Sequence, residues 1–181
     1  MYVYCLFCQT QKAKYVVSAL EARGFLRVFT PKIIRRQRVR GKNVDGLYDL
    51  LPGYVFVFSE EKLEDLRLLG GVTGVIRRLG SPEDQYALTG ADRDFALNLD
   101  RKGGVVGQVT LFKVGDAVRL DDPLFNGCAG RITRIDHKKG RARVDYQFAG
   151  MSCHTWVACE TVTLAEAQAE APIFGAAETK A

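Results

Sequence analysis

The chain has 181 residues, of which 47% are hydrophobic and 26% are charged, and its formal net charge is +5. This profile is typical of a soluble globular protein with one ordinary domain or two small ones. No apolar run approaches the ~20 residues that a membrane span needs, and no basic segment precedes the apolar N-terminus as in a secretory signal. We therefore expect a cytoplasmic protein with no membrane partner.

The first forty residues predict a strand, a helix and an extended segment. Residues 2–8 (YVYCLFC) are rich in aromatic and β-branched side chains, which favours a strand. Residues 11–24 carry apolar side chains at helical spacing and end at Gly24, where a helix C-cap would stand. Residues 25–43 should be extended, because Pro31 blocks a helix.

The following segments predict an α+β unit of about 100 residues. Residues 49–58 (DLLPGYVFVF) should form a strand that begins after a Pro-Gly turn. Ser59 could cap a helix over 60–71, with acids in its first turn. The segments 72–80 and 89–104 then predict a further strand and a short helix that ends in glycines.

The pattern changes in the C-terminal part of the chain. Residues 101–111 are charged and glycine-rich and predict a linker after a first domain at 1–100. Residues 112–164 contain short alternating segments with turn signals and no helical period, which predicts a small five-stranded β-barrel. The Ala/Glu-rich tail, 165–181, should be disordered.

Cations gather in two stretches of the chain. From Arg23 to Lys42 there are eight cations and no acid, and from Arg131 to Arg143 there are six cations and one acid, Asp136. Such clusters suggest a polyanionic partner such as nucleic acid, although a solvated face would also explain them.

The first cluster should present its cations as a row. Alternate residues of an extended strand share a face, and the ten steps from Lys32 to Lys42 span about 33 Å, enough to follow several phosphates. Gly41 would let the chain turn at its tip. The candidate nucleic-acid-binding residues are Lys32, Arg35, Arg36, Arg38, Arg40 and Lys42.

The chain has an odd number of cysteines, which favours reduced thiols in a cytosol. They are Cys5, Cys8, Cys128, Cys153 and Cys159. Cys5 and Cys8 form a C-x-x-C pair that would suit a thioredoxin-like redox site. A zinc site would need further ligands from Cys153, His154 and Cys159. The third interpretation is that these are buried structural cysteines, and we expect Cys5 and Cys8 to be reduced, buried and free of metal.

Three segments in this order resemble the NusG family of transcription elongation factors. LPGYVFVF at 51–58 looks like the P-G-Y strand of the family, GVTGVIRRLG at 71–80 looks like its G-V-x-G strand, and FKVGDAVRLDD followed by GCAGRITRID looks like its KOW motif. The resemblance covers 1–164. It implies an N-terminal NGN-like antiparallel sheet with flanking helices and a C-terminal KOW β-barrel. The barrel loop departs from the family pattern, because Asp122 precedes the proline where the family has glycine.

Within the family, GVIRRLG, GGVVGQVT and KKGRARV resemble the LoaP group. This resemblance implies an operon-specific antiterminator that binds RNA polymerase and is recruited by a nascent RNA hairpin, with displaced non-template DNA as the other candidate. It also implies an aromatic patch that docks on the β′ clamp helices of the polymerase, although the same side chains could simply be core residues. The corresponding residues here are Phe7, Leu51, Tyr54 and Phe56.

Other interpretations stay open at this point. The chain could be a general NusG-type factor or a KOW-containing ribosome-associated RNA-binding protein, and its barrel could contact a ribosomal protein, the termination factor Rho or RNA. Catalysis is not expected, because the two histidines, His137 and His154, are accompanied by no acid pair, serine motif or phosphate-binding glycine loop. We expect a monomer without cofactors.

Overall fold

The computed structural model describes residues 1–114, 117–120, 122–126, 128 and 130–163. The strands are β1 (Tyr2–Cys8), β2 (Arg27–Phe29), β3 (Lys32–Val39), β4 (Lys42–Asp49), β5 (Tyr54–Ser59), β6 (Val75–Arg78), β7 (Val105–Val106), β8 (Val109–Val114), β9 (Ala117–Leu120), β10 (Arg131–Asp136), β11 (Arg141–Phe148) and β12 (Met151–Thr163). The helices are η1 (Thr10–Lys12), α1 (Ala13–Glu21), η2 (Leu66–Leu69), α2 (Gly90–Arg101) and α3 (Pro123–Asn126). None of the helices in the described ranges is long and apolar enough to cross a membrane. The expected tail at 165–181 lies outside these ranges.

A four-stranded sheet with the order β2-β5-β1-β6 forms the N-terminal part of the fold. Its central strands, β1 and β5, are antiparallel, and the register pairs Cys5 with Phe56. Alternation separates the side chains of β5, so that Val55 and Val57 face α1, where they pack in one buried cluster with Leu20. Phe56 belongs to the opposite face and to a different cluster. The sequence-based prediction of an α+β fold is confirmed.

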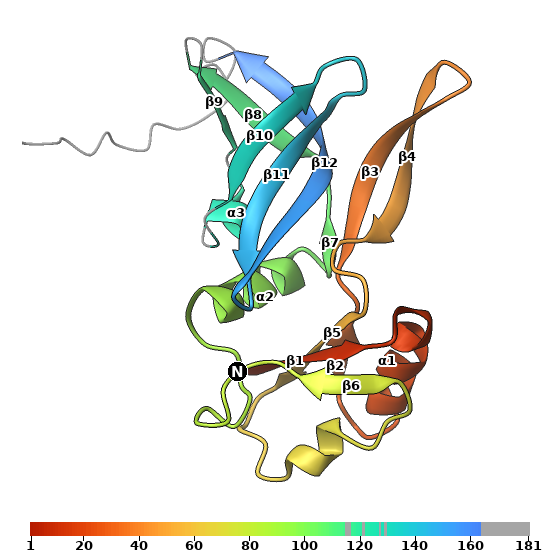
Figure 1. Cartoon of the computed structure of the whole chain (residues 1–181), viewed down its shortest axis with the longest axis vertical. Coiled ribbons are helices and arrows are strands. Elements are labelled where there is room, and N and C mark those ends of the chain that lie inside the picture. Colours follow the sequence, from red (N-terminus) through yellow and green to blue (C-terminus); the bar gives the residue numbers. More distant parts are fainter. Residues whose placement is uncertain (115–116, 121, 127, 129, 164–181) are drawn as a thin grey trace, which may run out of the picture.

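The second face of this sheet continues into the C-terminal part of the molecule. Helix α2 lies between the sheet and the barrel (Figure 1). One cluster of buried side chains runs from Val3 and Phe56 in the sheet, through Phe95 and Leu99 in α2, to Phe148 in the barrel. The two parts therefore share a continuous hydrophobic core.

The C-terminal part is a five-stranded sheet with the order β10-β11-β12-β8-β9, and contacts between β9 and β10 curl it toward a barrel. Along β11 the even-numbered residues from Ala142 to Phe148 are buried and the odd-numbered ones are not, as expected for one face packed on a core. The segment 101–111 expected to be a linker contains β7 and the start of β8. Strand β7 pairs in parallel with the beginning of β3.

The prediction of a helix over 60–71 is wrong, because only the short η2 forms there. The Ser59 hydroxyl donates to the Glu61 carbonyl and so caps no helix, whereas Asp65 accepts a hydrogen bond from the Arg67 N–H at the start of η2. Residues 60–64 are mostly exposed, so they offer no apolar face that would offset the cost of helix nucleation.

Candidate partner and nucleic-acid interfaces

The aromatic side chains of the predicted interface meet on the second face of the four-stranded sheet. Phe7 and Tyr54 stand opposite each other on β1 and β5, with ring centres 5.2 Å apart and ring planes inclined by 54°. The turn before β5 depends on Gly53, whose φ is +84° and whose position would bring a Cβ to 2.6 Å from the Cys8 carbonyl oxygen. The Pro-Gly-Tyr sequence therefore fixes Tyr54 beside Phe7.

The barrel covers this aromatic face. The Phe148 ring lies 6.0 Å from Tyr54 and 5.6 Å from Phe56 in edge-to-face geometry, and 5.1 Å from Phe95 of α2. The Tyr54 hydroxyl donates to Sδ of Met151 at 3.8 Å. Tyr54 is consequently 9% exposed and Phe56 is fully buried, and this burial raises the pKa of Tyr54.

The other two predicted residues share this environment. Leu51 is buried and Phe7 is half-buried, and both belong to or pack against the same hydrophobic cluster as Phe148. The four residues are thus brought together in one cluster, and Phe148 and Met151 cover the part of it that Tyr54 and Phe56 form.

Helix α2 holds that connection in place. Ala149 and Gly150 both have positive φ, 50° and 74°, and form the tight turn between β11 and β12. The Ala149 N–H donates to the Asp92 carboxylate of α2 at 2.8 Å. The F-A-G stretch at 148–150 was among the turn signals of the predicted barrel, but the roles of Phe148 and Asp92 were missed from the sequence.

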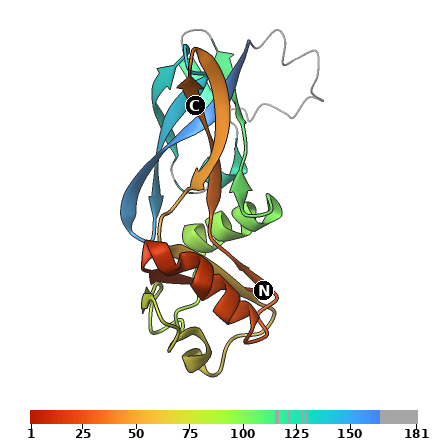
Figure 2. The same ribbon diagram turned by 90° about the vertical axis from the view of Figure 1, so that its right-hand side faces the viewer.

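The cationic segment forms a β-hairpin that stands beside the barrel (Figures 1 and 2). Strands β3 and β4 pair along their whole length, and the tip is Arg40-Gly41, with φ of 49° and 80°. The turn at Gly41 was predicted correctly, but the prediction that all the cations form a single row is wrong. Lys42 pairs with Val39 on the returning strand, so it lies on the opposite hairpin face from Arg36 and Arg38.

The cations at the base and middle of the hairpin have protein partners. Lys32 forms an ion pair with Asp49, and Arg36 donates two hydrogen bonds to Asp45 at 2.8 and 3.0 Å. These hydrogen bonds raise the pKa of Arg36 and hold the pKa of Asp45 below its usual range. Both acids come from β4, a strand that was not predicted, so the expected acid-free row was too simple.

Arg35 faces the barrel. Its Nη2 donates to the Thr155 hydroxyl of β12 at 3.3 Å, and its guanidinium lies 5.6 Å from the Tyr48 ring centre. Its Nε is buried without a hydrogen-bond partner. Arg35 is therefore part of the contact between hairpin and barrel, where it is only partly open to solvent.

The cations at the tip are open to solvent. Arg38, Arg40 and Lys42 are exposed, and none of the ion pairs found in the described part of the chain involves them. Of the six predicted nucleic-acid residues, these three keep their charges free for a phosphate backbone.

Comparison with known proteins identifies the family of this chain. A family model described as "Transcription termination factor nusG" matches residues 1–94, slightly more than half of the 181-residue chain. The chain belongs to the NusG family. The matched region contains every predicted polymerase-binding and nucleic-acid-binding residue.

Two NusG relatives show how far the sequence of this chain has diverged from theirs. The "Transcription termination/antitermination protein NusG" of Rickettsia typhi is 29% identical over 112 residues, which are 61% of this chain and 58% of that protein. The protein of the same name from Vibrio cholerae is 30% identical over 101 residues, 55% of this chain and 56% of that protein. The match thus spans less than two thirds of these relatives' length. A solved structure described as "Domain interaction in Thermotoga maritima NusG" has a TM-score of 0.49 and 21% identity, and it covers 86% of this chain and 92% of that chain.

The C-x-x-C pair of this NusG-family chain is arranged unlike a redox site. Cys5 and Cys8 belong to different buried clusters, one on each side of the four-stranded sheet. Cys8 donates to the Gly53 carbonyl at 3.0 Å, and burial raises the pKa of both thiols, opposite to what an attacking thiolate needs. In the described ranges, no group of three or more metal-ligating side chains lies close enough to hold a metal.

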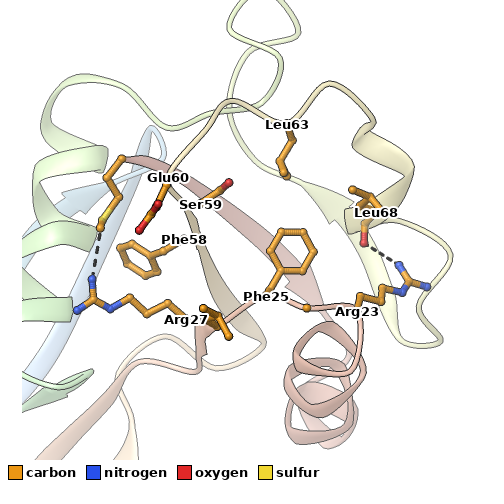
Figure 3. A pocket seen from close by; sticks show the side chains of 11 residues that line it. Arg23, Phe25, Arg27, Phe58, Ser59, Glu60, Leu63 and Leu68 are labelled. Atoms are coloured by element: carbon orange, nitrogen blue, oxygen red, sulfur yellow. Dashed lines mark hydrogen bonds between the residues drawn. The ribbon is translucent and has the colours of Figure 1, made fainter.

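A groove of about 550 Å³ lies where β2 and the segment before it meet the end of β5 (Figure 3). Phe25, Phe58 and Leu68 line it, and Glu60 is the one carboxylate among its lining residues. The Arg23 guanidinium donates to the Leu68 carbonyl at 2.7 Å, and Arg27 pairs with Asp100 at 3.1 Å. The groove therefore offers no acid–base pair for catalysis.

Proposed function

We propose that the chain is an operon-specific transcription elongation and antitermination factor that binds RNA polymerase and is recruited by a nascent RNA hairpin. The observation that carries the proposal is the aromatic face on which Phe7, Tyr54 and Phe56 meet. This face lies within the part of the chain that matches the NusG family. Aromatic side chains gathered in one patch are the chemistry of a protein-binding hot spot.

The aromatic face would receive the tip of the β′ clamp helices of RNA polymerase. An apolar helix tip could pack against the Tyr54 and Phe56 rings in the place that Phe148 occupies in the free chain. Polymerase binding therefore requires β11 and β12 to move off the sheet. The binding energy of the polymerase must exceed that of the intramolecular contact.

The hairpin tip would supply recruitment. Arg38, Arg40 and Lys42 can contact phosphates, and arginine forks can also reach guanine edges or unpaired loop bases. RNA is the preferred target because of the likeness to the LoaP group, and displaced non-template DNA is the alternative. No step of this function needs a cofactor or a catalytic group, and we infer that the chain is not an enzyme.

Two other functions compete with this one. A general NusG-type factor would associate with transcription of most genes, and a ribosome-associated RNA-binding protein would not need the aromatic face. The barrel could serve either by contacting a ribosomal protein or Rho. These alternatives differ from the proposal in which particle they join and in how many transcripts they affect.

The deciding experiment is affinity purification of the tagged chain from its own cells, followed by sequencing of transcripts in cells with and without it. The proposal predicts co-purification of RNA polymerase and loss of readthrough past terminators in one or a few long operons. Co-purification of ribosomes without polymerase would contradict it, and uniform changes over most genes would favour the general factor.

A further inference from the structure

We propose that the β10–β11 turn of the barrel (residues 137–140) and the tip of the β3–β4 hairpin form one composite RNA-binding surface. This surface is complete only while the barrel packs on the N-terminal part, so the RNA brings the closed chain to the transcript and is released when polymerase opens the barrel. The inference rests on the proposed function of the hairpin tip, and it adds a second element and a conformational requirement to it.

The β10–β11 turn touches the middle of the hairpin, although about 100 residues separate them in the sequence. A Cβ placed on Gly140 would lie 3.2 Å from Nη1 and 3.5 Å from Cδ of Arg36. Arg36 also donates to the Gln108 side chain at 3.2 Å, and Gln108 in turn donates to Glu160 of β12 at 3.1 Å. These contacts fasten the middle of the hairpin to the barrel beside this turn. Figure 2 shows the hairpin lying in front of the barrel.

Free positive charge lies on both sides of this junction. On the hairpin side are the exposed Arg38, Arg40 and Lys42, and on the barrel side are the exposed Lys138 and the half-buried Lys139. Neither lysine takes part in the ion pairs found among the described residues.

Two of the three acids at the junction are neutralised locally, and the third, the exposed Glu160, accepts a hydrogen bond from Gln108. Asp45 is paired with Arg36, and Asp136 is paired with Arg141 at 3.3 Å while it accepts the Lys139 backbone N–H at 3.2 Å. Both elements therefore carry an excess of free positive charge. A folded phosphate backbone fits such a surface, because each cation can neutralise one phosphate and release a counterion.

The strand that leaves the turn adds a feature suited to unpaired bases. The Arg141 guanidinium lies 4.4 Å from the Trp156 ring centre on the outer face of the barrel. A stacked guanidinium and indole offer a flat surface on which a loop base could stack, as proteins that read single-stranded RNA do. This favours an RNA stem–loop over a duplex as the occupant.

The test uses the full chain and an RNA stem–loop selected by the wild-type chain from a pool with a randomised loop. Lys138→Ala/Lys139→Ala should weaken binding about tenfold at moderate salt and reduce the slope of log affinity against log salt by about 1 to 2. Lys12→Ala/Lys14→Ala removes the same charge from exposed positions at the start of α1, on the face of the sheet opposite to the barrel, and should change the affinity less than about twofold. Unfolding temperatures verify that each variant is folded.

A third variant separates this inference from the proposed function. Arg38→Ala/Arg40→Asn alters the hairpin tip, with Asn chosen because residue 40 has a positive φ of 49°. If this variant loses RNA binding and the Lys138/Lys139 variant does not, the composite surface is wrong while the hairpin still binds RNA. If neither variant loses binding, or if the wild-type chain selects no RNA, both proposals fail. A loss that appears with single-stranded DNA of the same sequence but not with RNA also overturns the inference.

Discussion

The two predicted interfaces of this molecule lie in opposite environments. The aromatic face around Tyr54 and Phe56 is covered by Phe148, whereas the hairpin tip with Arg38 and Arg40 is exposed. The difference follows from the cost of leaving each kind of surface in water. Exposing an aromatic patch to water is unfavourable and promotes aggregation. The free chain therefore buries this patch against its own barrel. Cationic side chains are well hydrated and need no cover.

The first test of this comparison uses a variant that lacks the aromatic face itself. Tyr54→Ala/Phe56→Ala should weaken polymerase binding by about 3 to 5 kcal/mol, the scale of an interface hot spot. Because both side chains also pack against Phe148 in the free chain, the unfolding midpoint should fall as well. Titration calorimetry with purified polymerase would measure the loss, and a folded variant with wild-type affinity would refute the proposed interface.

Removing the cover should have the opposite effect on polymerase binding. Phe148→Ala deletes the ring that contacts Tyr54, Phe56 and Phe95, so the closed state should lose about 2 kcal/mol relative to the open one. Polymerase affinity should rise about thirtyfold, because less of the binding energy is spent on opening. RNA affinity should fall only as far as the closed population falls, so it stays nearly unchanged while the full thirtyfold gain is reached.

A matched control for this variant is Val157→Ala. Val157 is also a buried residue of the barrel, but it pairs with Ala142, well away from the β11–β12 turn. It should lower stability without raising polymerase affinity. Equal gains from both variants would mean that general loosening, rather than exposure of the aromatic face, is responsible.

Removing the hydrogen bond between Asp92 of α2 and the Ala149 N–H should also raise polymerase affinity, but by less. Asp92→Ala removes the acceptor of the Ala149 N–H and should weaken the closed state by about 1 kcal/mol. Polymerase affinity should then rise about fivefold. The same calorimetric titration would measure this gain, and an unchanged polymerase affinity would show that this hydrogen bond does not hold the barrel.

The smallest expected effect concerns the exposed hairpin. Arg36 lowers the pKa of Asp45 in the folded chain, so this pair stabilises folding above the unfolded pKa of about 3.9 and loses its effect as the pH falls through the lower folded value. Asp45→Asn should cost no more than about 0.5 kcal/mol at neutral pH, because both side chains are solvent-screened. Thermal unfolding should show this difference at pH 6 and none near pH 2. A larger cost at low pH would contradict the assignment.

The sequence predicted those features that local patterns determine. The alternation of YVFVF places Tyr54 and Phe56 on one face and Val55 and Val57 on the other, as in the structure, since the strand period fixes which side chains share a face. The Pro-Gly turn and the alternating barrel strands were recognised for the same reason. The helix over 60–71 failed because charge pattern and a possible cap do not replace an apolar face.

Contacts between distant segments could not be predicted in this way. Nothing near Phe148 in the sequence indicates that its ring packs on Tyr54, and nothing near Arg36 indicates that Gly140 lies beside it. Asp45 and Asp49 could not be recognised as ion-pair partners without the hairpin geometry. The chain turns at Arg40-Gly41, and the returning strand brings both acids opposite the cations. These contacts decide which predicted residues are free to bind.

Strand β7 limits how far the barrel can travel once it leaves the sheet. It is held to β3 by parallel pairing and by the hydrogen bond from the Lys32 N–H to the Gly104 carbonyl at 2.8 Å. Only Gly107 and Gln108 separate it from β8, a tether of about 10 Å. The released barrel therefore stays at an effective local concentration in the millimolar range or above. A partner on the aromatic face must outcompete a ligand that never diffuses away, and the chain should close again soon after the partner dissociates.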